Sequence, residues 1–186
     1  MGQQIGSLFG TMHFRQMCIN VYQDSFTASL SVVTNHAYGL TLLHMPPPHR
    51  PGVYLPDQNR FTVWPMSKVK GYFNNLRLAD LELGAFRQAM EQSGEWDQTW
   101  VILSADHSWR ESRLYDGKRD MRVPFLVKPP KGGELMTYPQ QFNTVLTHDL
   151  ILAMLRGEIT NEAAVATWFD AHRLPTGNIT APGKLD

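Results

Sequence analysis

A cluster of four prolines restricts what the middle of this chain can fold into. The prolines stand at positions 46, 47, 48 and 51. Each fixes its own φ angle and has no backbone N–H, so the segment can form neither a helix nor an inner strand. We expect a rigid, extended loop that runs to about residue 66. The apolar run before it, residues 38–44, is predicted to be a buried strand that ends at His44.

The residues after this loop predict a long helix and a second strand. Ser67 is expected to cap a helix that ends near Ser93, with Gly94 just past its end. Residues 99–104 form a continuous apolar run, as in a strand covered on both faces. Strand, helix and strand together would give a parallel βαβ unit with a right-handed connection. The apolar face of the helix is expected to consist of Phe73, Leu76, Leu83, Phe86 and Met90.

The remaining segments complete an α/β chain with a mostly parallel sheet. A helix is expected over about 12–33, and another strand over 122–127, with Pro124 at its start or on an edge. Two short helices are expected near the C-terminus, one over 148–156 and one after a cap at Asn161. We expect one domain, 1–186, with a helical N-terminal segment at 1–36 and a flexible tail at 175–186.

Composition and charge exclude several classes of protein. Hydrophobic residues make up 42% and charged residues 18%, which is typical of a globular chain. The net charge is zero, so no overall positive field favours nucleic acid or an anionic membrane. Cys18 is the only cysteine, which excludes an intrachain disulfide and a cysteine-rich zinc site. No signal peptide or membrane span is recognisable; the sequence leaves the compartment open, and the chain as written would be cytoplasmic.

Candidate ligand residues follow the two predicted strands. The first strand ends at His44, with His49 in the loop beyond, and the second is followed by Asp106 and His107. Ligands bind beyond the carboxyl ends of strands in open α/β sheets, and parallel strands would place both groups at one edge. A carboxylate beside an imidazole suits Zn²⁺ or Mn²⁺.

Four segments, taken in order, resemble the alkaline phosphatase/sulfatase superfamily. Residues 72–84 look like the long helix before its metal site, and 96–107 like the strand ending in serine-x-aspartate-histidine. Residues 122–125 are similar to its "RVP" strand, and 44–51 to its "H-x-P-x-P-H-x-P" loop. The resemblance covers roughly Gly39 to Gly157 and implies that 38–157 is a sulfatase-like core. The implied fold is part of a three-layer α/β/α structure.

The resemblance also implies roles for individual residues. Asp106 and His107 would be metal ligands, His49 would contact the phosphate or sulfate group, and Lys118 would bind the substrate oxyanion. His44 could orient either group, although a hydrogen-bonded structural role is equally open. Lys118 could instead belong to a solvated run of charges. Asp116 stands where related phosphoethanolamine transferases have a histidine, which argues against a transferase-type site.

The implied activity is metal-dependent hydrolysis of a small phosphate or sulfate ester. Zn²⁺ or Mn²⁺ is the expected ion, with Ca²⁺ or Mg²⁺ as alternatives. The nucleophile, however, has no match: residues 18–22 lack the proline and arginine of a Cys-x-Pro-x-Arg motif, and no Asp-x-Thr or Asp-x-Ser precedes them. We therefore expect a truncated chain without its nucleophile. The alternatives are a non-catalytic metal- or anion-binding domain and a structural homo-oligomer.

Overall fold

The computed structural model describes residues 2–173, and it divides the chain into two compact units. Unit 1 comprises Met1–Trp96 and Ala105–Val123, and unit 2 comprises Asp97–Ser104 and Pro124–Asp186. Each unit has its own hydrophobic core. The expectation of one domain over 1–186 stays a prediction. The tail predicted at 175–186 lies outside the described residues.

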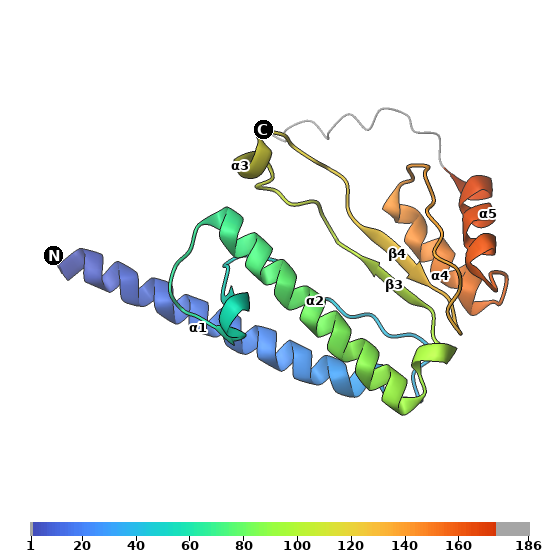
Figure 1. Cartoon of the computed structure of the whole chain (residues 1–186), viewed down its shortest axis with the longest axis horizontal. Helices are drawn as coiled ribbons and strands as arrows, with labels where there is room; N and C mark the ends of the chain where they lie inside the picture. Colours follow the sequence, from blue (N-terminus) through green and yellow to red (C-terminus); the bar gives the residue numbers. More distant parts are fainter. Residues whose placement is uncertain (1, 174–186) are drawn as a thin grey trace. The chain divides into compact units, whose positions relative to one another are not determined.

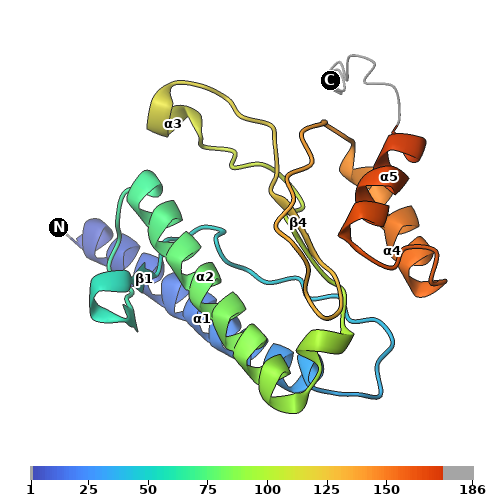
Figure 2. The same cartoon turned by 45° about the vertical axis from the view of Figure 1, so that its right-hand side comes forward.

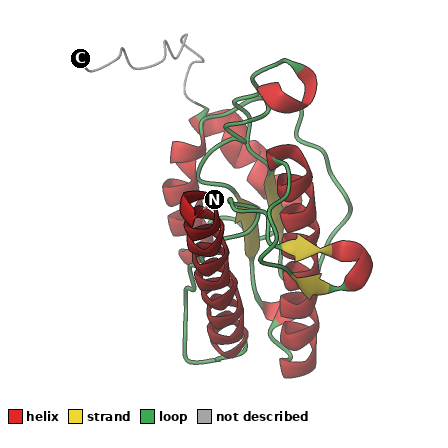
Figure 3. Cartoon of the chain, turned by 90° about the vertical axis from the view of Figure 1, so that its left-hand side faces the viewer, coloured by secondary structure: helices red, strands yellow, loops and turns green. Residues whose placement is uncertain are grey.

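Unit 1 is built on two long helices that contact each other, α1 (Gly2–Val33) and α2 (Lys68–Ser93) (Figure 1). A small hairpin lies against α2, formed by β1 (Tyr54–Leu55) and β2 (Arg60–Phe61) around the 3₁₀ turn η1 (Pro56–Gln58) (Figure 3). One short helix, α3 (Arg113–Asp116), completes the unit. The buried apolar residues of the unit 1 core are Ile19, Tyr22, Val53, Tyr54 and Leu78.

The ends of α2 are where the sequence predicted them. The Ser67 hydroxyl accepts a hydrogen bond from the backbone N–H of Lys70, and Gly94 ends the helix with a φ of 80°. Near the start of the helix, the backbones of Gly71 and Gly52 lie so close that a side chain on either would clash with the other. The helix thereby packs directly on the proline-rich loop.

The buried face of α2 differs from the predicted one. Phe73 and Leu76 are exposed, whereas Phe86 and Met90 are buried as expected. The prediction failed in part because it counted only apolar residues, and two polar residues lie on the buried face. The buried residues of α2 are Gly71, Asn75, Leu78, Glu82, Phe86 and Met90.

Unit 2 is a two-stranded sheet covered by helices. Strands β3 (Val101–Ser104) and β4 (Phe125–Lys128) pair antiparallel, with Ser104 opposite Phe125. The core lies between one face of this sheet and the two helices α4 (Thr147–Leu155) and α5 (Glu162–His172) (Figure 2). Two 3₁₀ turns, η2 (Trp96–Gln98) and η3 (Thr144–Leu146), precede β3 and α4.

The predicted strand at 38–44 and the parallel βαβ unit are wrong. Residues 38–44 form an irregular segment, and Leu42 is 89% exposed. Both sheets among the described residues are two-stranded and antiparallel, so the apolar run has no neighbouring strand to supply hydrogen bonds. The mixture of helices and small sheets is consistent with an α/β class. Neither sheet within residues 2–173 is parallel, and the three-layer α/β/α fold stays a prediction.

The other predicted elements are present with shifted bounds. The helix expected over 12–33 lies within α1, and Asn161 caps α5 by accepting from the Ala164 N–H. The strand expected at 122–127 begins only after Pro124, and β3 is not covered on both faces, because Leu103 and Ser104 are exposed. No helix in the described part of the chain combines the length and apolar character that a bilayer span requires.

Candidate functional site

Two loops of unit 1 meet at a pair of histidines. The proline-rich loop carries His49, and the loop after β3 carries His107; the ring centroids are 6.4 Å apart, with the rings at 73°. Beside them, Arg50 Nε lies 2.9 Å from Glu111 Oε1, which joins the same two loops by an ion pair. The structure therefore brings His49 and His107 together, with Asp106 beside His107; these three residues are here called the His49–His107 cluster.

The proline-rich loop is held in place by Asn75, a fully buried residue of α2. Its Oδ1 accepts from the Val53 N–H at 3.0 Å, and its Nδ2 donates to the carbonyls of His49 and Pro51 at 2.7 and 3.0 Å. The Tyr22 hydroxyl of α1 donates to the same His49 carbonyl at 2.8 Å. Both long helices therefore fix the backbone of His49.

The loop after β3 is anchored on α2 by aromatic contacts. Trp109 stacks on Tyr72 with ring centroids 4.1 Å apart and an interplanar angle of 6°. Phe73 meets Trp109 edge-on at 5.8 Å and Tyr115 at 5.2 Å. Such pairs contribute about 0.5–1.5 kcal/mol each beyond the area they bury. The exposed position of Phe73 on α2 is thus explained by its role in this aromatic group.

The two histidines of the cluster make the same hydrogen bond with their Nδ1 atoms. The Nδ1 atom of His49 lies 2.8 Å from the Arg50 carbonyl, and that of His107 lies 2.8 Å from the Ser108 carbonyl. A carbonyl oxygen can only accept a hydrogen bond, so we assign the proton of each neutral ring to Nδ1. This leaves Nε2 of each ring with a lone pair, the arrangement found in metal-ligating histidines.

The donors of the cluster fit a divalent cation only in part. Asp106 Oδ2 and His107 Nε2 lie 3.9 Å apart, and the side chains are 67% and 36% exposed. One ion with bonds of about 2.0–2.2 Å could reach both atoms. Zinc, however, normally has at least three protein ligands. Among the described residues, no group of three or more His, Cys, Asp or Glu side chains could hold a metal ion.

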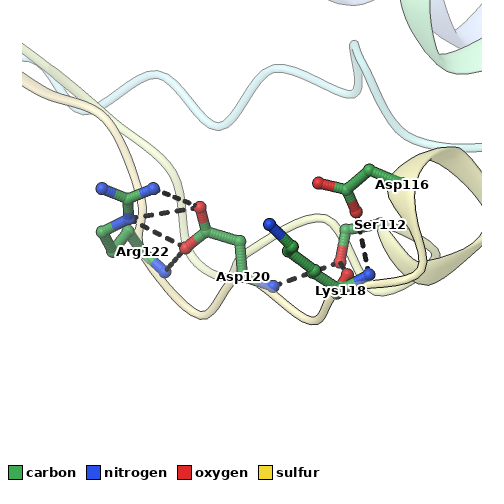
Figure 4. A network of polar contacts seen from close by, with 5 residues as sticks. All are labelled: Ser112, Asp116, Lys118, Asp120 and Arg122. Carbon is green, nitrogen blue, oxygen red and sulfur yellow. Dashed lines mark hydrogen bonds and ion pairs between the residues drawn. The ribbon is translucent and has the colours of Figure 1, made fainter.

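Lys118 lies in a turn that is shaped by its neighbours (Figure 4). The Asp116 carboxylate accepts from the Lys118 N–H at 2.9 Å, and the Ser112 hydroxyl donates to the Lys118 carbonyl at 3.1 Å. Two residues on, hydrogen bonds from Arg122 lower the pKa of Asp120 to about 2. The Lys118 ammonium itself is exposed, and no partner for it is found in residues 8–173. The Asp116 carboxylate therefore stabilises this turn by accepting a backbone hydrogen bond.

His44 is not joined to the cluster. Its side chain is exposed, and within the described residues no hydrogen bond, ion pair or ring contact links it to His49, Asp106 or His107. No contact links Lys118 to these three residues either, on the same described part of the chain. The roles predicted for all five residues stay predictions.

Sequence reasoning missed the residues that hold the cluster. Asn75 and Tyr22 fix His49, Glu111 pairs with Arg50, and the buried Ser112 accepts from the Asp120 N–H at 3.3 Å. The one signal available for Asn75 was a polar residue between apolar positions of a helix. Such a side chain is normally hydrogen-bonded when it is buried.

The Arg50–Glu111 pair is expected to contribute little to stability by itself. The Arg50 side chain is half exposed, and ion pairs of that kind contribute about 0.2–1 kcal/mol. A double-mutant cycle with Arg50→Gln and Glu111→Gln, followed by urea unfolding, should give a coupling energy in this range. A coupling well above it would mean that the pair carries the contact between the two loops alone.

Comparison with known proteins adds one match. The family model described as "Sulfatase" matches residues 13–155, more than half of the 186 residues. No curated protein and no solved structure matches the chain significantly. The matched region begins within α1, ends at the last residue of α4 and contains both loops of the His49–His107 cluster.

Proposed function

Because this chain belongs to the sulfatase family, we propose that it binds the anionic group of a sulfate or phosphate ester at the His49–His107 cluster and supports hydrolysis of that ester. The observation that carries the proposal is the meeting of the two loops. His49 and His107 come from segments 58 positions apart (107 − 49), and their rings lie 6.4 Å apart. The His49 side chain is exposed and that of His107 is partly exposed, so both imidazoles are accessible to a ligand.

The proposed roles follow from the chemistry of each side chain. A protonated His49 carries N–H groups on both ring nitrogens, so its Nε2–H can donate to an ester oxygen while Nδ1–H stays on the Arg50 carbonyl. A charge-assisted hydrogen bond of this kind is about twice as strong as a neutral one. Lys118, whose ammonium has no partner among the described residues, is proposed as a second cation for the same anion.

Asp106 and His107 are proposed to supply two ligands to a divalent cation. When bound, such an ion would act as a Lewis acid for the charge that develops on the ester oxygens. Two protein ligands predict weak binding, since each further ligand adds affinity. No step of the reaction is assigned through this ion.

A binding function without turnover is the second candidate. The observation in its favour concerns Cys18, the one thiol of the chain. It lies in α1, and burial raises its pKa, which lowers the fraction of reactive thiolate. A site that recognises the anion and leaves the ester intact would need only the cluster.

The test is calorimetric titration of the full chain, first with Zn²⁺ or Mn²⁺ and then with sulfate and phosphate. We expect His107→Ala and Asp106→Ala to weaken metal binding about 10- to 100-fold. His49→Ala should weaken anion binding by about tenfold and leave metal binding nearly unchanged. His148→Ala is the matched control, because this exposed histidine of unit 2 pairs, among the described residues, only with Asp149.

Hydrolysis of p-nitrophenyl sulfate and p-nitrophenyl phosphate separates the two candidates. Turnover that Asp106→Ala abolishes would establish the hydrolase, while anion binding without turnover would favour the binding function. Equal titration curves for the wild type, His49→Ala and His107→Ala would contradict both.

A further inference from the structure

A second candidate binding region lies in unit 1, between the two long helices and the small hairpin. It is a cavity of about 340 Å³ lined by residues of α1, α2 and the β1–β2 hairpin. This volume falls within the range of about 300–1,000 Å³ that small-molecule sites occupy. The aromatic side chains in its lining are Tyr22, Phe26, Tyr54 and Phe61.

One carboxylic acid lines this cavity. Glu82 of α2 is only 6% exposed, and within the described residues no group donates a hydrogen bond to its carboxyl or pairs with it as an ion. Buried acids are normally paired, because an isolated buried charge is costly. No lysine or arginine is present in the lining, so the protein itself supplies no counter-charge.

We propose that this cavity binds a small organic ammonium ion, with Glu82 as its counter-ion and the rings of Phe26 and Phe61 beside it. A carboxylate and aromatic rings that line one cavity are the combination that recognises alkylated ammonium groups, since the face of each ring attracts a cation. A metal ion would need several hard or borderline ligands, and Glu82 is the only carboxylate in the lining. An anion or a neutral apolar molecule would leave the carboxyl without a partner.

The ionisation of Glu82 makes the proposed binding depend on pH. Burial raises the pKa of this carboxyl to about 7. The other titratable groups that face it are Tyr22 from α1 and Tyr54 from the hairpin. Burial raises the pKa of Tyr22 as well, with smaller effects of Cys18 and Glu82, so this phenol stays neutral near pH 7. A proton and the organic cation therefore compete for Glu82 alone.

The experiment is titration of the full chain with choline and tetramethylammonium chlorides, followed by nuclear magnetic resonance of the backbone amides. The neutral carbon analogue of choline, 3,3-dimethylbutan-1-ol, shows whether binding requires the positive charge of the ligand. Potassium chloride at equal ionic strength shows whether the amide shifts are an unspecific effect of salt. We expect choline to shift amides of α1, α2 and the hairpin, and its neutral analogue to bind about tenfold more weakly. Affinity for choline should rise by about tenfold from pH 6 to pH 8, because the ionised fraction of Glu82 rises from about 0.09 to about 0.91.

Two variants make the assignment specific to one residue. Glu82→Gln keeps the shape of the side chain and should lower the affinity for choline by about tenfold and remove its pH dependence. Glu91→Gln, an exposed acid on the same helix paired with Arg87, should leave both unchanged. The proposal is overturned if choline binds no better than its neutral analogue, or if Glu82→Gln keeps the wild-type affinity. If Glu82→Gln fails to fold, the wild type provides the test: an affinity for choline that does not rise between pH 6 and pH 8 overturns the proposal.

Discussion

Replacing Asn75 with alanine is expected to lower the free energy of unfolding by about 3–5 kcal/mol. The amide of Asn75 satisfies the Val53 N–H and the carbonyls of His49 and Pro51, and the residue is completely buried. A buried polar group that loses its partner costs about 1–3 kcal/mol. The His49 carbonyl keeps its bond from Tyr22, which limits the loss. Urea unfolding followed by circular dichroism measures the change.

The neighbouring residue provides the matched control for Asn75. Asn74 donates to the Tyr54 carbonyl at 2.9 Å and, more weakly, to the Met66 sulfur at 3.7 Å, and it lies only half buried. Asn74→Ala should therefore cost about 1 kcal/mol. Equal losses in the two variants would show that Asn75 does not hold the proline-rich loop. If Asn75→Ala loses more stability than Asn74→Ala, it should also bind the anion more weakly, because His49 would no longer be fixed from α2.

Replacing Gly71 with alanine is expected to destabilise the protein by about 1–3 kcal/mol. In most helices the same change is favourable, since alanine exceeds glycine in helix propensity by about 1 kcal/mol. Here the new Cβ would lie 2.9 Å from the Cα of Gly52, a contact between a side chain and backbone that no rotamer can relieve. Either α2 or the proline-rich loop must move away.

Gly84 in the same helix isolates the steric effect. A Cβ at this position meets no atom within 4 Å, so Gly84→Ala should raise the free energy of unfolding by up to about 1 kcal/mol. Both variants are compared by urea unfolding. If Gly71→Ala also stabilises the protein, the close approach of the two glycines is not a constraint on the fold.

Local rules predicted the parts of the fold that depend on neighbouring residues. The capping residues Ser67 and Asn161 and the helix-ending Gly94 are recognisable within a few positions, because each satisfies backbone groups of its own helix. The strand at 38–44 could not be judged in this way. An apolar run forms a strand only where another strand pairs with it, and the partner is a property of the whole fold.

The meeting of His49 with His107 was expected, although from a sheet that does not form. The parallel strands that were to bring them together are absent from the described residues. Instead, Asn75 holds one loop from 26 positions away, and Trp109 stacks the other on Tyr72. A side chain whose bonds are this distant leaves no periodic signal, so neither anchor could be predicted from sequence pattern alone. The expectation rested on parallel strands and on the family resemblance, and of these two only the family is confirmed.

Two hydrogen bonds to the His49 carbonyl link the packing of the two long helices to the position of a residue in the candidate site. Tyr22 comes from one long helix and Asn75 from the other, so the carbonyl is fully coordinated only while the helices are together. If α1 and α2 part, the carbonyl loses the bond from Tyr22 and keeps the bond from Asn75. The packing of α1 on α2 and the position of the His49 backbone are therefore coupled.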